Sequence, residues 1–583
     1  MILYNRKTKA LSNMTGTTLQ NAFQILKAEG WALGFGFFSS MLLYLSFFPA
    51  NLGFLCWIAL APLLYVMRSN VQLRIKLLSA SICGLCFYIP ALQWMRLADP
   101  MMYFTWIGLA IYCNLFFVSA IFLTLKFNKV SLVFSFPLIW IAFEHFRSTF
   151  LGGFSWYLLA HSQHDYPFII QISDLFGAYG VSFLVASVNG FFAESFLPLK
   201  NKTLKAQAVY VLLLILFTLT YGALRTSQGI GEAGPVCASL QGNVEQNIRN
   251  EPSNAETASD PYLRLSDSSI ASNPDLIIWP ETSYSREWYS ISPEMKPEKI
   301  PPDWNRITQI QKTLGEEVRK RWNTSILLGL NSQELTPTGI KRYNSALLVS
   351  NDENKISRYD KIHRVPFGEF IPFKEVFPFL KNFAPYDFEY SIVSGAGYPN
   401  IEFPMGPDKQ TFVKFGTLIC YEDTDPSIPL GFFKSGNSPN FFINISNDGW
   451  FKGSEEHEQH LAIARFRAVE TRRAIIRSVN MGISALIDSN GKVLKPDSTE
   501  STNQANSFIW KINYPGPKSK ALATSDWHKF KANQGTLIAA IPIDSRFSLY
   551  TKTGDLLPYA CWLALLSIII FSTKKNPVPT SDI

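Results

Sequence analysis

The chain has 583 residues, of which 47% are apolar, 14% aromatic and 17% charged. A soluble domain carries about 25% charged residues, so the composition excludes a simple soluble enzyme, and the aromatic content excludes an intrinsically disordered chain. The net charge of +8 fits a nucleic-acid-binding protein or a basic membrane protein, so the positions of the charges must decide between them.

Charge-poor segments at both ends of the chain predict a membrane domain. Residues 31–67 contain no Asp, Glu, Lys or Arg and are interrupted only by a turn-like segment at 49–53, which fits two spans. Further spans are predicted at Leu77–Met95, Met102–Leu125, Val130–Phe143, Gly177–Leu197, Ala206–Leu224 and Leu556–Thr573. This gives seven helices within residues 31–225 and an eighth within 555–575; a soluble core of buried helices is the less favoured alternative.

Lysine and arginine are concentrated on one side of these spans. Basic clusters precede the first span, separate the second from the third, and follow the fourth, sixth and eighth. Because cytoplasmic loops carry the excess of positive charge, residues 1–30 and 576–583 are predicted to be cytoplasmic. Residues 226–554 then lie on the other side of the membrane.

Residues 226–554 have the alternating pattern of a layered domain that contains strands and helices. Strands are predicted at Val236–Gln241, Asp275–Trp279, Ser325–Leu330, Ser345–Ser350, Phe412–Ile419, Asn440–Ile445, Ile475–Ile487 and Thr536–Ile541, and helices at Trp304–Arg321 and Glu456–Arg473. The segment lacks a Gly-rich nucleotide-binding motif, a P-loop and paired C-x-x-C motifs, so neither a nucleotide nor a zinc ion is expected.

Cys420 has the surroundings of a nucleophile. Of the seven cysteines, only Cys237 and Cys420 lie outside the predicted spans; a disulfide between them is one alternative, and Cys237 is expected in the core. Cys420 ends an apolar strand, where a thiol can project into a pocket and the next backbone N–H can face an oxyanion. Such a thiol needs a base and a nearby cation; Glu281 closes a predicted strand, and Lys361 lies in the segment Arg358–Glu369.

Three motifs carry a family resemblance. W-P-E-T contains Glu281, Y-D-K-x-H-x-V-P-F-G-E-F-x-P contains Lys361 and Glu369, and I-C-Y-E contains Cys420, in this order along the chain. They resemble the Glu–Lys–Cys triad of the nitrilase superfamily, and with the predicted spans the chain is similar to the bacterial apolipoprotein N-acyltransferases. The resemblance implies an α-β-β-α sandwich for residues 226–554, which an inner-membrane domain holds in the periplasm. It also implies that the protein is a monomer that uses no cofactor or metal and binds no nucleic acid.

The resemblance also implies a reaction. A phospholipid donates an acyl chain to Cys420, and the α-amine of a diacylglyceryl-cysteine lipoprotein then receives it. Glu281 is expected to act as base, Lys361 and the Tyr421 N–H to hold the oxyanion, and Glu369 to orient Lys361; Tyr421 and Glu422 match further positions needed for activity. A membrane-anchored amidase and a lipid carrier without activity are the alternatives.

Several residues have plainer interpretations. His363 is expected to be structural, and His457 and His460 to lie on a solvated helix face rather than to bind a metal. Trp450 and Phe451 are either core or lipid-facing. Residues 494–535 are expected to be an irregular insertion, or else a basic face for lipid headgroups. The chain resembles the family again at Gln241-Gly242-Asn243, but the segment from there to Asn250 lacks a Trp that many relatives carry after this motif, so one expected substrate contact is missing.

Overall fold

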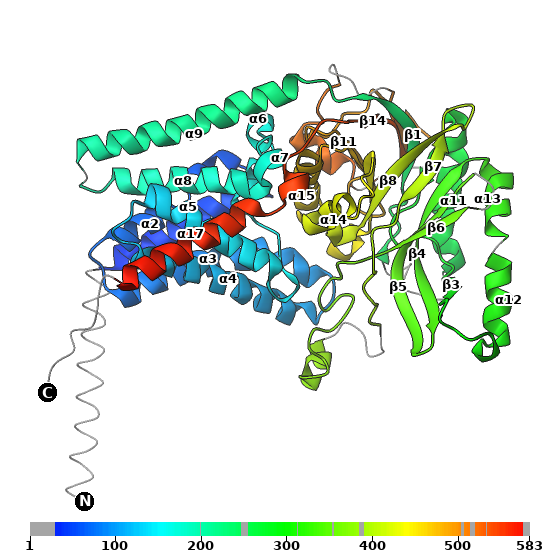
Figure 1. Cartoon of the computed structure of the whole chain (residues 1–583), viewed down its shortest axis with the longest axis horizontal. Coiled ribbons are helices and arrows are strands. Elements are labelled where there is room, and N and C mark those ends of the chain that lie inside the picture. Colours follow the sequence, from blue (N-terminus) through cyan, green and yellow to red (C-terminus); the bar gives the residue numbers. More distant parts are fainter. Residues whose placement is uncertain are drawn as a thin grey trace, which may run out of the picture.

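The computed structural model describes residues 29–198, 200–246, 255–311, 313–351, 355–383, 390–502, 507–513, 519–531 and 533–574. A helical part and a part built on β-sheets lie side by side (Figure 1). The predicted cytoplasmic segment 576–583 and the residues around Asn250 lie outside the described residues, as does most of segment 1–30.

Every predicted span coincides with a helix. A helix covers residues 29–46, and the others are α2 (Ala61–Arg68), α3 (Leu73–Ala91), α4 (Met102–Lys126), α5 (Leu132–Thr149), α8 (Ala178–Ser195), α9 (Asn201–Ser227) and α17 (Leu556–Lys574). Among the described residues, three helices are long and apolar enough to cross a membrane: 73–97, 102–126 and 201–227. A fourth is added if the pair 167–176 and 178–195, bent by 118°, is one span. Some of the other predicted spans are shorter helices, such as α2. Others carry buried charge, such as α5 with Glu144 and Arg147.

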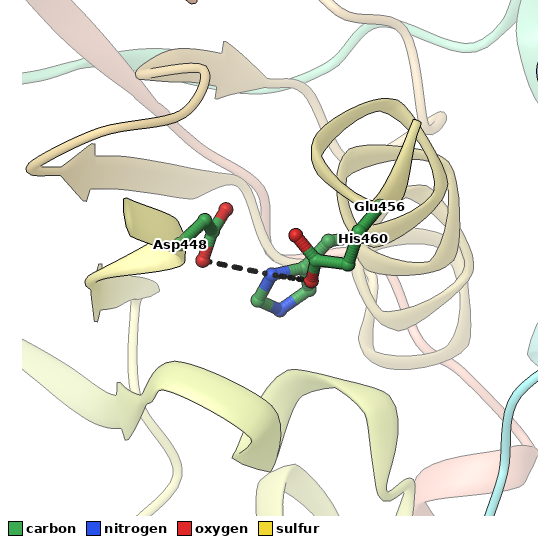
Figure 2. A group of neighbouring side chains, drawn as sticks. All are labelled: Asp448, Glu456 and His460. Atoms are coloured by element: carbon green, nitrogen blue, oxygen red, sulfur yellow. Dashed lines mark hydrogen bonds and ion pairs between the residues drawn. The ribbon is translucent and has the colours of Figure 1, made fainter. Parts of the chain in front are cut away.

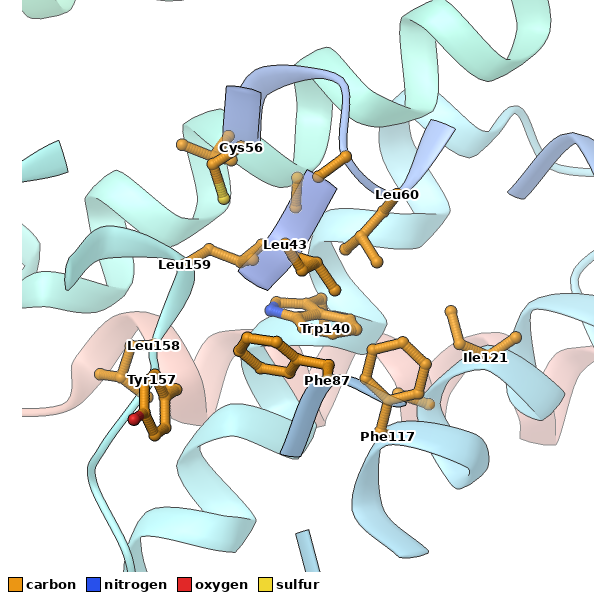
Figure 3. Packing of buried hydrophobic residues seen from close by; sticks show 14 of the residues in the cluster. Leu43, Cys56, Leu60, Phe87, Phe117, Ile121, Trp140, Tyr157, Leu158 and Leu159 are labelled. Carbon is orange, nitrogen blue, oxygen red and sulfur yellow. The ribbon is translucent and has the colours of Figure 1, made fainter. Parts of the chain in front are cut away.

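Large side chains hold the helical part together. Trp140 of α5 packs edge-on against Phe117 of α4 at a centroid distance of 5.5 Å. Figure 3 shows these two residues converging with Phe87 of α3, with Leu43 of the helix 29–46 and with Leu60, which directly precedes α2. Because lipid chains are as apolar as these side chains, close packing rather than burial from water must hold the helices together.

Two sheets form the core of the second part. The larger has nine strands in the order β12-β13-β14-β1-β2-β4-β5-β6, with β3 paired to β4; the smaller has the order β11-β10-β9-β8-β7. The strands are β1 (Glu232–Gln241), β2 (Leu276–Ile278), β3 (Trp288–Ile291), β4 (Ser325–Thr336), β5 (Gly339–Val349), β6 (Ile356–Asp360), β7 (Ile401–Met405), β8 (Thr411–Ile419), β9 (Phe441–Ser446), β10 (Ile475–Val479), β11 (Ala485–Ile487), β12 (Ser498–Ser501), β13 (Ser507–Ile512) and β14 (Gln534–Ile543).

The layering follows from the alternation of side chains along the strands. In β2, Leu276 and Ile278 face the smaller sheet, whereas Ile277 packs toward α11 (Ala255–Ser269) and α13 (Leu314–Trp322). On the other side, α14 (Ser427–Lys434) and α15 (Glu456–Thr471) cover the smaller sheet. The architecture is therefore the expected α-β-β-α sandwich.

Three sequence predictions need correction. The strand predicted at 475–487 is an antiparallel pair, because β10 ends before a turn that contains Gly482 at φ +151°. The helix predicted at 304–321 is divided into α12 (Pro302–Gln311) and α13. The irregular insertion predicted for 494–535 is wrong in its described part, since β12 and β13 extend the larger sheet and Trp527 is completely buried.

Helix α15 is the link between the two parts. All its residues are buried, although they include five Glu or His residues at 456–460 and 470. Ile463 and Phe466 belong to the core of the helical part, whereas Leu461 and Ala464 belong to the core between the sheets. The predicted solvated face is therefore wrong, because the partner that covers it comes from a distant part of the sequence.

Polar contacts fix the end of α15 to the helical part. Arg472 is fully buried and adopts φ +51° after the helix. Its guanidinium donates to Asp174 Oδ2 at 2.8 Å and Gln171 Oε1 at 2.7 Å in the helical part, and to the Ser489 carbonyl at 3.1 Å and Asn490 Oδ1 at 3.0 Å beside the sheets. One side chain thus ties both parts together.

Arg472→Met is expected to destabilise the protein by about 3 kcal/mol, because it removes one partner from a buried ionic network. Asp174 keeps its ion pair with Arg225 at 2.8 Å, which limits the loss. The matched control is Arg321→Met, which breaks an exposed pair with Asp267 and should cost under about 1 kcal/mol. Thermal unfolding of the detergent-solubilised variants measures both, and equal shifts would contradict this role of Arg472.

Candidate active site

The three predicted catalytic residues meet where strands of the two sheets end. Glu281 follows β2, Lys361 follows β6 and Cys420 follows β8. Lys361 Nζ lies 3.5 Å from Glu281 Oε1 and 2.7 Å from Glu369 Oε1. Lys361 and Glu281 are only 1% and 6% exposed, so their charges act on each other with little screening by water.

Electrostatics prepare the thiol and the lysine differently. Desolvation and the Glu281 carboxylate raise the pKa of the Cys420 thiol well above its usual range, while Lys361 lowers it. Burial lowers the pKa of Lys361, but Glu369 and Glu281 outweigh it and raise the pKa overall. The thiol is therefore protonated and the lysine charged, so the thiol can attack only if a base takes its proton.

Two asparagines that the sequence analysis missed hold Glu281. Asn344 Nδ2 in β5 donates to Glu281 Oε1 at 2.7 Å and to Glu369 Oε1 at 3.3 Å, and the Asn447 backbone N–H donates to Glu281 Oε2 at 3.0 Å. Both Glu281 oxygens are thus oriented. Asn344 had no distinguishing signal in the sequence, because a polar residue in a strand usually faces water.

Glu369 closes the loop that carries Lys361. Its Oε1 accepts from Lys361, and its Oε2 accepts from the Val365 N–H at 2.8 Å. The carboxylate therefore both balances the charge of the lysine and sets its position.

Glu422 lies behind the nucleophile. Its carboxylate accepts from the N–H groups of Ile419, Ile362 and His363 at 2.7–3.0 Å and from the Tyr359 hydroxyl at 2.9 Å. Burial raises the pKa of Glu422 to about 7, against the opposing effect of these backbone donors. Glu422 thus fastens the Lys361 loop to the turn that presents Cys420.

The Cys420 turn also has aromatic support. Tyr421 stacks on Trp156 of the helical part at a centroid distance of 6.3 Å and packs edge-on against His363. His363 Nδ1 lies 2.6 Å from Asp425 Oδ2. These contacts give His363 the structural surroundings that we expected.

A cavity of about 500 Å³ opens onto Cys420. The helical part and the loops after β6 supply its apolar walls, which include Trp94, Phe104, Leu109, Tyr112, Leu151, Phe154, Trp156, Val365, Phe367 and Phe373. Phe451 also lines it and packs edge-on against Trp94. Its polar end contains Cys420, Asp448, Glu456 and His460. The shape and lining fit an apolar chain whose reacting end lies at the thiol.

The polar end contains one arrangement with metal-ligand chemistry. Ligand atoms of Asp448, Glu456 and His460 lie within 4.8 Å of one another, and His457 is outside this group. His460 Nε2 lies 2.7 Å from Asp423 Oδ1, and its Nδ1 lies 3.2 Å from Asp448 Oδ1. Burial lowers the pKa of His460, but both aspartates raise it, to about 10 overall. Both ring nitrogens thus already have a carboxylate partner within the protein.

Comparisons with known proteins agree with the motifs. Residues 39–191 match the family model of the apolipoprotein N-acyltransferase N-terminal domain, and residues 242–506 match that of the carbon-nitrogen hydrolases. The apolipoprotein N-acyltransferase of Geobacter metallireducens is 31% identical over 475 residues, which cover 78% of this chain and 85% of the relative. The chain belongs to the apolipoprotein N-acyltransferase family. The member from Chlorobaculum tepidum is 27% identical over 556 residues, covering 90% of this chain and 93% of its own.

One alternative for the cysteines is wrong. All seven cysteines lie within the described residues, and none of them forms a disulfide. Cys237 is completely buried in β1, as expected for a core residue. Cys420 instead faces the cavity.

Asn344→Leu is expected to slow thioester formation about 10- to 100-fold, because a hydrogen bond to a charged group contributes about 1.5–3 kcal/mol. Leucine keeps the volume but leaves Glu281 and Glu369 without their shared donor. The rate is read by intact mass spectrometry after mixing with phospholipid. Asn331→Leu, in β4 and exposed, is the control, and a similar loss in both variants would refute a specific role for Asn344.

Proposed function

We propose that this chain transfers an acyl chain from a membrane phospholipid, through a thioester on Cys420, to the α-amine of a diacylglyceryl-cysteine lipoprotein. The observation that carries the proposal is the apolar cavity, walled by the helical part, that ends at a thiol flanked by Glu281 and Lys361. A soluble amidase would have no need for walls supplied by membrane helices.

In the first half-reaction Glu281 takes the Sγ proton, and Sγ attacks the ester carbonyl of the phospholipid. Lys361 and the Tyr421 N–H stabilise the resulting oxyanion. As the tetrahedral intermediate collapses, the C–O bond breaks, and the leaving alkoxide takes the proton from Glu281. The products are an acyl-thioester and a lysophospholipid.

In the second half-reaction the acceptor ammonium first loses one proton to solvent. The amine nitrogen then attacks the thioester carbonyl, so that a C–N bond forms and the C–S bond breaks. Glu281 carries the second nitrogen proton to Sγ and thereby restores the thiol. The apolar walls limit the access of water, which would otherwise hydrolyse the thioester.

The proposed function requires the chain to lie in a membrane with its catalytic domain on one side. Residues 31–225 provide seven spans and 555–575 the eighth, in a bacterial inner membrane. The catalytic domain, 226–554, is periplasmic, and segments 1–30 and 576–583 are cytoplasmic. The basic clusters between the predicted spans support this orientation. The enzyme acts as a monomer, since one chain supplies the whole constellation around Cys420.

Intact mass spectrometry tests the reaction. The wild-type protein is incubated with phospholipid and then with a diacylated lipopeptide whose α-amine is free; Cys420→Ala is treated in parallel. We expect one acyl mass on the wild type alone, which then moves to the peptide. No adduct would favour a carrier, and discharge to water alone would favour an amidase; either result overturns the proposal.

A further inference from the structure

The cavity next to Cys420 is apolar except at one corner. Asp448 comes from the turn after β9, and Glu456 and His460 come from the first turns of α15. Figure 2 shows the three side chains pointing toward one another across the gap between these elements. All three line the cavity that Cys420 lines. The roles proposed above for Glu281, Lys361 and Cys420 do not use them.

This corner holds carboxylate oxygens that have no hydrogen-bond partner. Within the part of the chain that the structure describes, Glu456 Oε2 and Asp448 Oδ2 are buried without a hydrogen-bond partner, and the two residues are 3% and 2% exposed. Burying an unsatisfied carboxylate oxygen is costly, so such groups point to a ligand that completes them. The ligand must donate hydrogen bonds.

The charges at the corner indicate a cationic ligand. His460 and Arg477 supply positive charge, but both are committed to Asp423 and Asp448. Among the described residues, the nearest cation to Glu456 is His460, at 3.7 Å, which is beyond hydrogen-bonding distance. Asp448 Oδ2 likewise has Arg477 only at 3.8 Å. Asp423, Asp448 and Glu456 therefore outnumber these two cations. Burial and the neighbouring Asp448 raise the pKa of Glu456 well above its usual range, so a further cation is needed to keep this carboxyl ionised.

A primary ammonium fits this corner better than a metal ion. It offers three N–H donors, enough to reach both unpartnered oxygens, and needs no lone pair from the protein. A metal would need His460 Nδ1, which already lies 3.2 Å from Asp448 Oδ1. The acceptor in the proposed reaction is itself a primary ammonium.

We propose that Asp448 and Glu456 bind the α-ammonium of the acceptor lipoprotein beside Cys420. The inference rests on the proposed function and assigns its second substrate to a defined subsite. Once the bound ammonium has lost one proton, the amine nitrogen lies next to the thioester, so its attack is effectively intramolecular and is favoured over attack by water. The donor phospholipid has no such cation at its ester, so the corner acts in the second half-reaction.

Glu456→Gln tests the subsite, because the amide keeps the shape and removes the charge. The matched control is Glu455→Gln, the same change on the preceding residue. Glu455 does not line the cavity, and its Oε1 accepts a hydrogen bond from Gln93 Nε2 at 3.3 Å. Each protein is loaded with acyl chain from phospholipid, and discharge of the thioester is followed at increasing concentrations of free-amine lipopeptide. We expect the half-saturating concentration to rise at least 10-fold for Glu456→Gln and less than 2-fold for Glu455→Gln.

A second measurement needs only the wild-type protein. An α-N,N-dimethyl lipopeptide keeps the cation but forms no stable amide, whereas an α-N-acetyl lipopeptide is neutral. The dimethyl analogue should inhibit discharge at a concentration at least 10-fold lower than the acetyl analogue. This comparison stands even if Glu456→Gln fails to fold.

The outcomes separate the two proposals. If the wild type forms no thioester, the proposed function fails. If the thioester forms, but Glu456→Gln leaves the half-saturating concentration unchanged or the two analogues inhibit equally, this subsite is refuted. Metal analysis of the purified protein tests whether the corner binds a metal ion instead. A stoichiometric divalent cation that is lost in Glu456→Gln would show a metal site and overturn the inference.

Discussion

Cys420→Ser is expected to lower acyl transfer by at least about 10⁴-fold, as the loss of a covalent nucleophile does in other enzymes. A serine hydroxyl is far less acidic than a thiol, so a carboxylate in the position of Glu281 cannot remove its proton. Any oxygen ester that formed would also be a poorer acyl donor to an amine. The rate is measured as transfer of acyl chain from phospholipid to a free-amine lipopeptide.

The control for this change is Cys86→Ser, which alters an exposed cysteine of the helical part and should leave the rate within 2-fold. Phospholipid binding should persist in Cys420→Ser, because the cavity walls are untouched. Transfer by Cys420→Ser at the wild-type rate would show that the acyl chain travels by another residue.

Lys361→Met should lower the rate of thioester formation by about 10³-fold, since it removes an oxyanion donor and a charge that favours the thiolate. It should also destabilise the fold by about 3–5 kcal/mol, because Glu281 and Glu369 then share a buried site without a cation. Thioester formation is followed by intact mass spectrometry and stability by thermal unfolding.

A double variant separates these two effects. Lys361→Met with Glu369→Gln removes a positive and a negative charge together, so much of the stability should return. Activity should not return, because neither methionine nor glutamine replaces the cation near Cys420. Recovery of both quantities together would mean that Lys361 only holds the fold.

The helices and the motifs could be read from the sequence because they depend on local order. Runs without charge between residues 31 and 225 mark helices wherever they pack, and the motifs around Glu281, Lys361 and Cys420 mark three strand ends. Residues 475–487 were misjudged as one strand, since an apolar run does not reveal the turn inside it.

The contacts between distant segments depended on the tertiary structure. The sequence around Asn344 is that of any polar strand residue, and its contact with Glu281 follows only from the position of β5 beside the end of β2. The sequence of α15 is that of a solvated helix, and its burial follows only from its packing against the helical part. Asp448 and Glu456 lie on separate elements, so the sequence did not indicate that they line one cavity as neighbours. A sequence determines local periodicity and residue chemistry, whereas burial and the pairing of charges are set by which distant surfaces meet, and here those surfaces meet around Cys420.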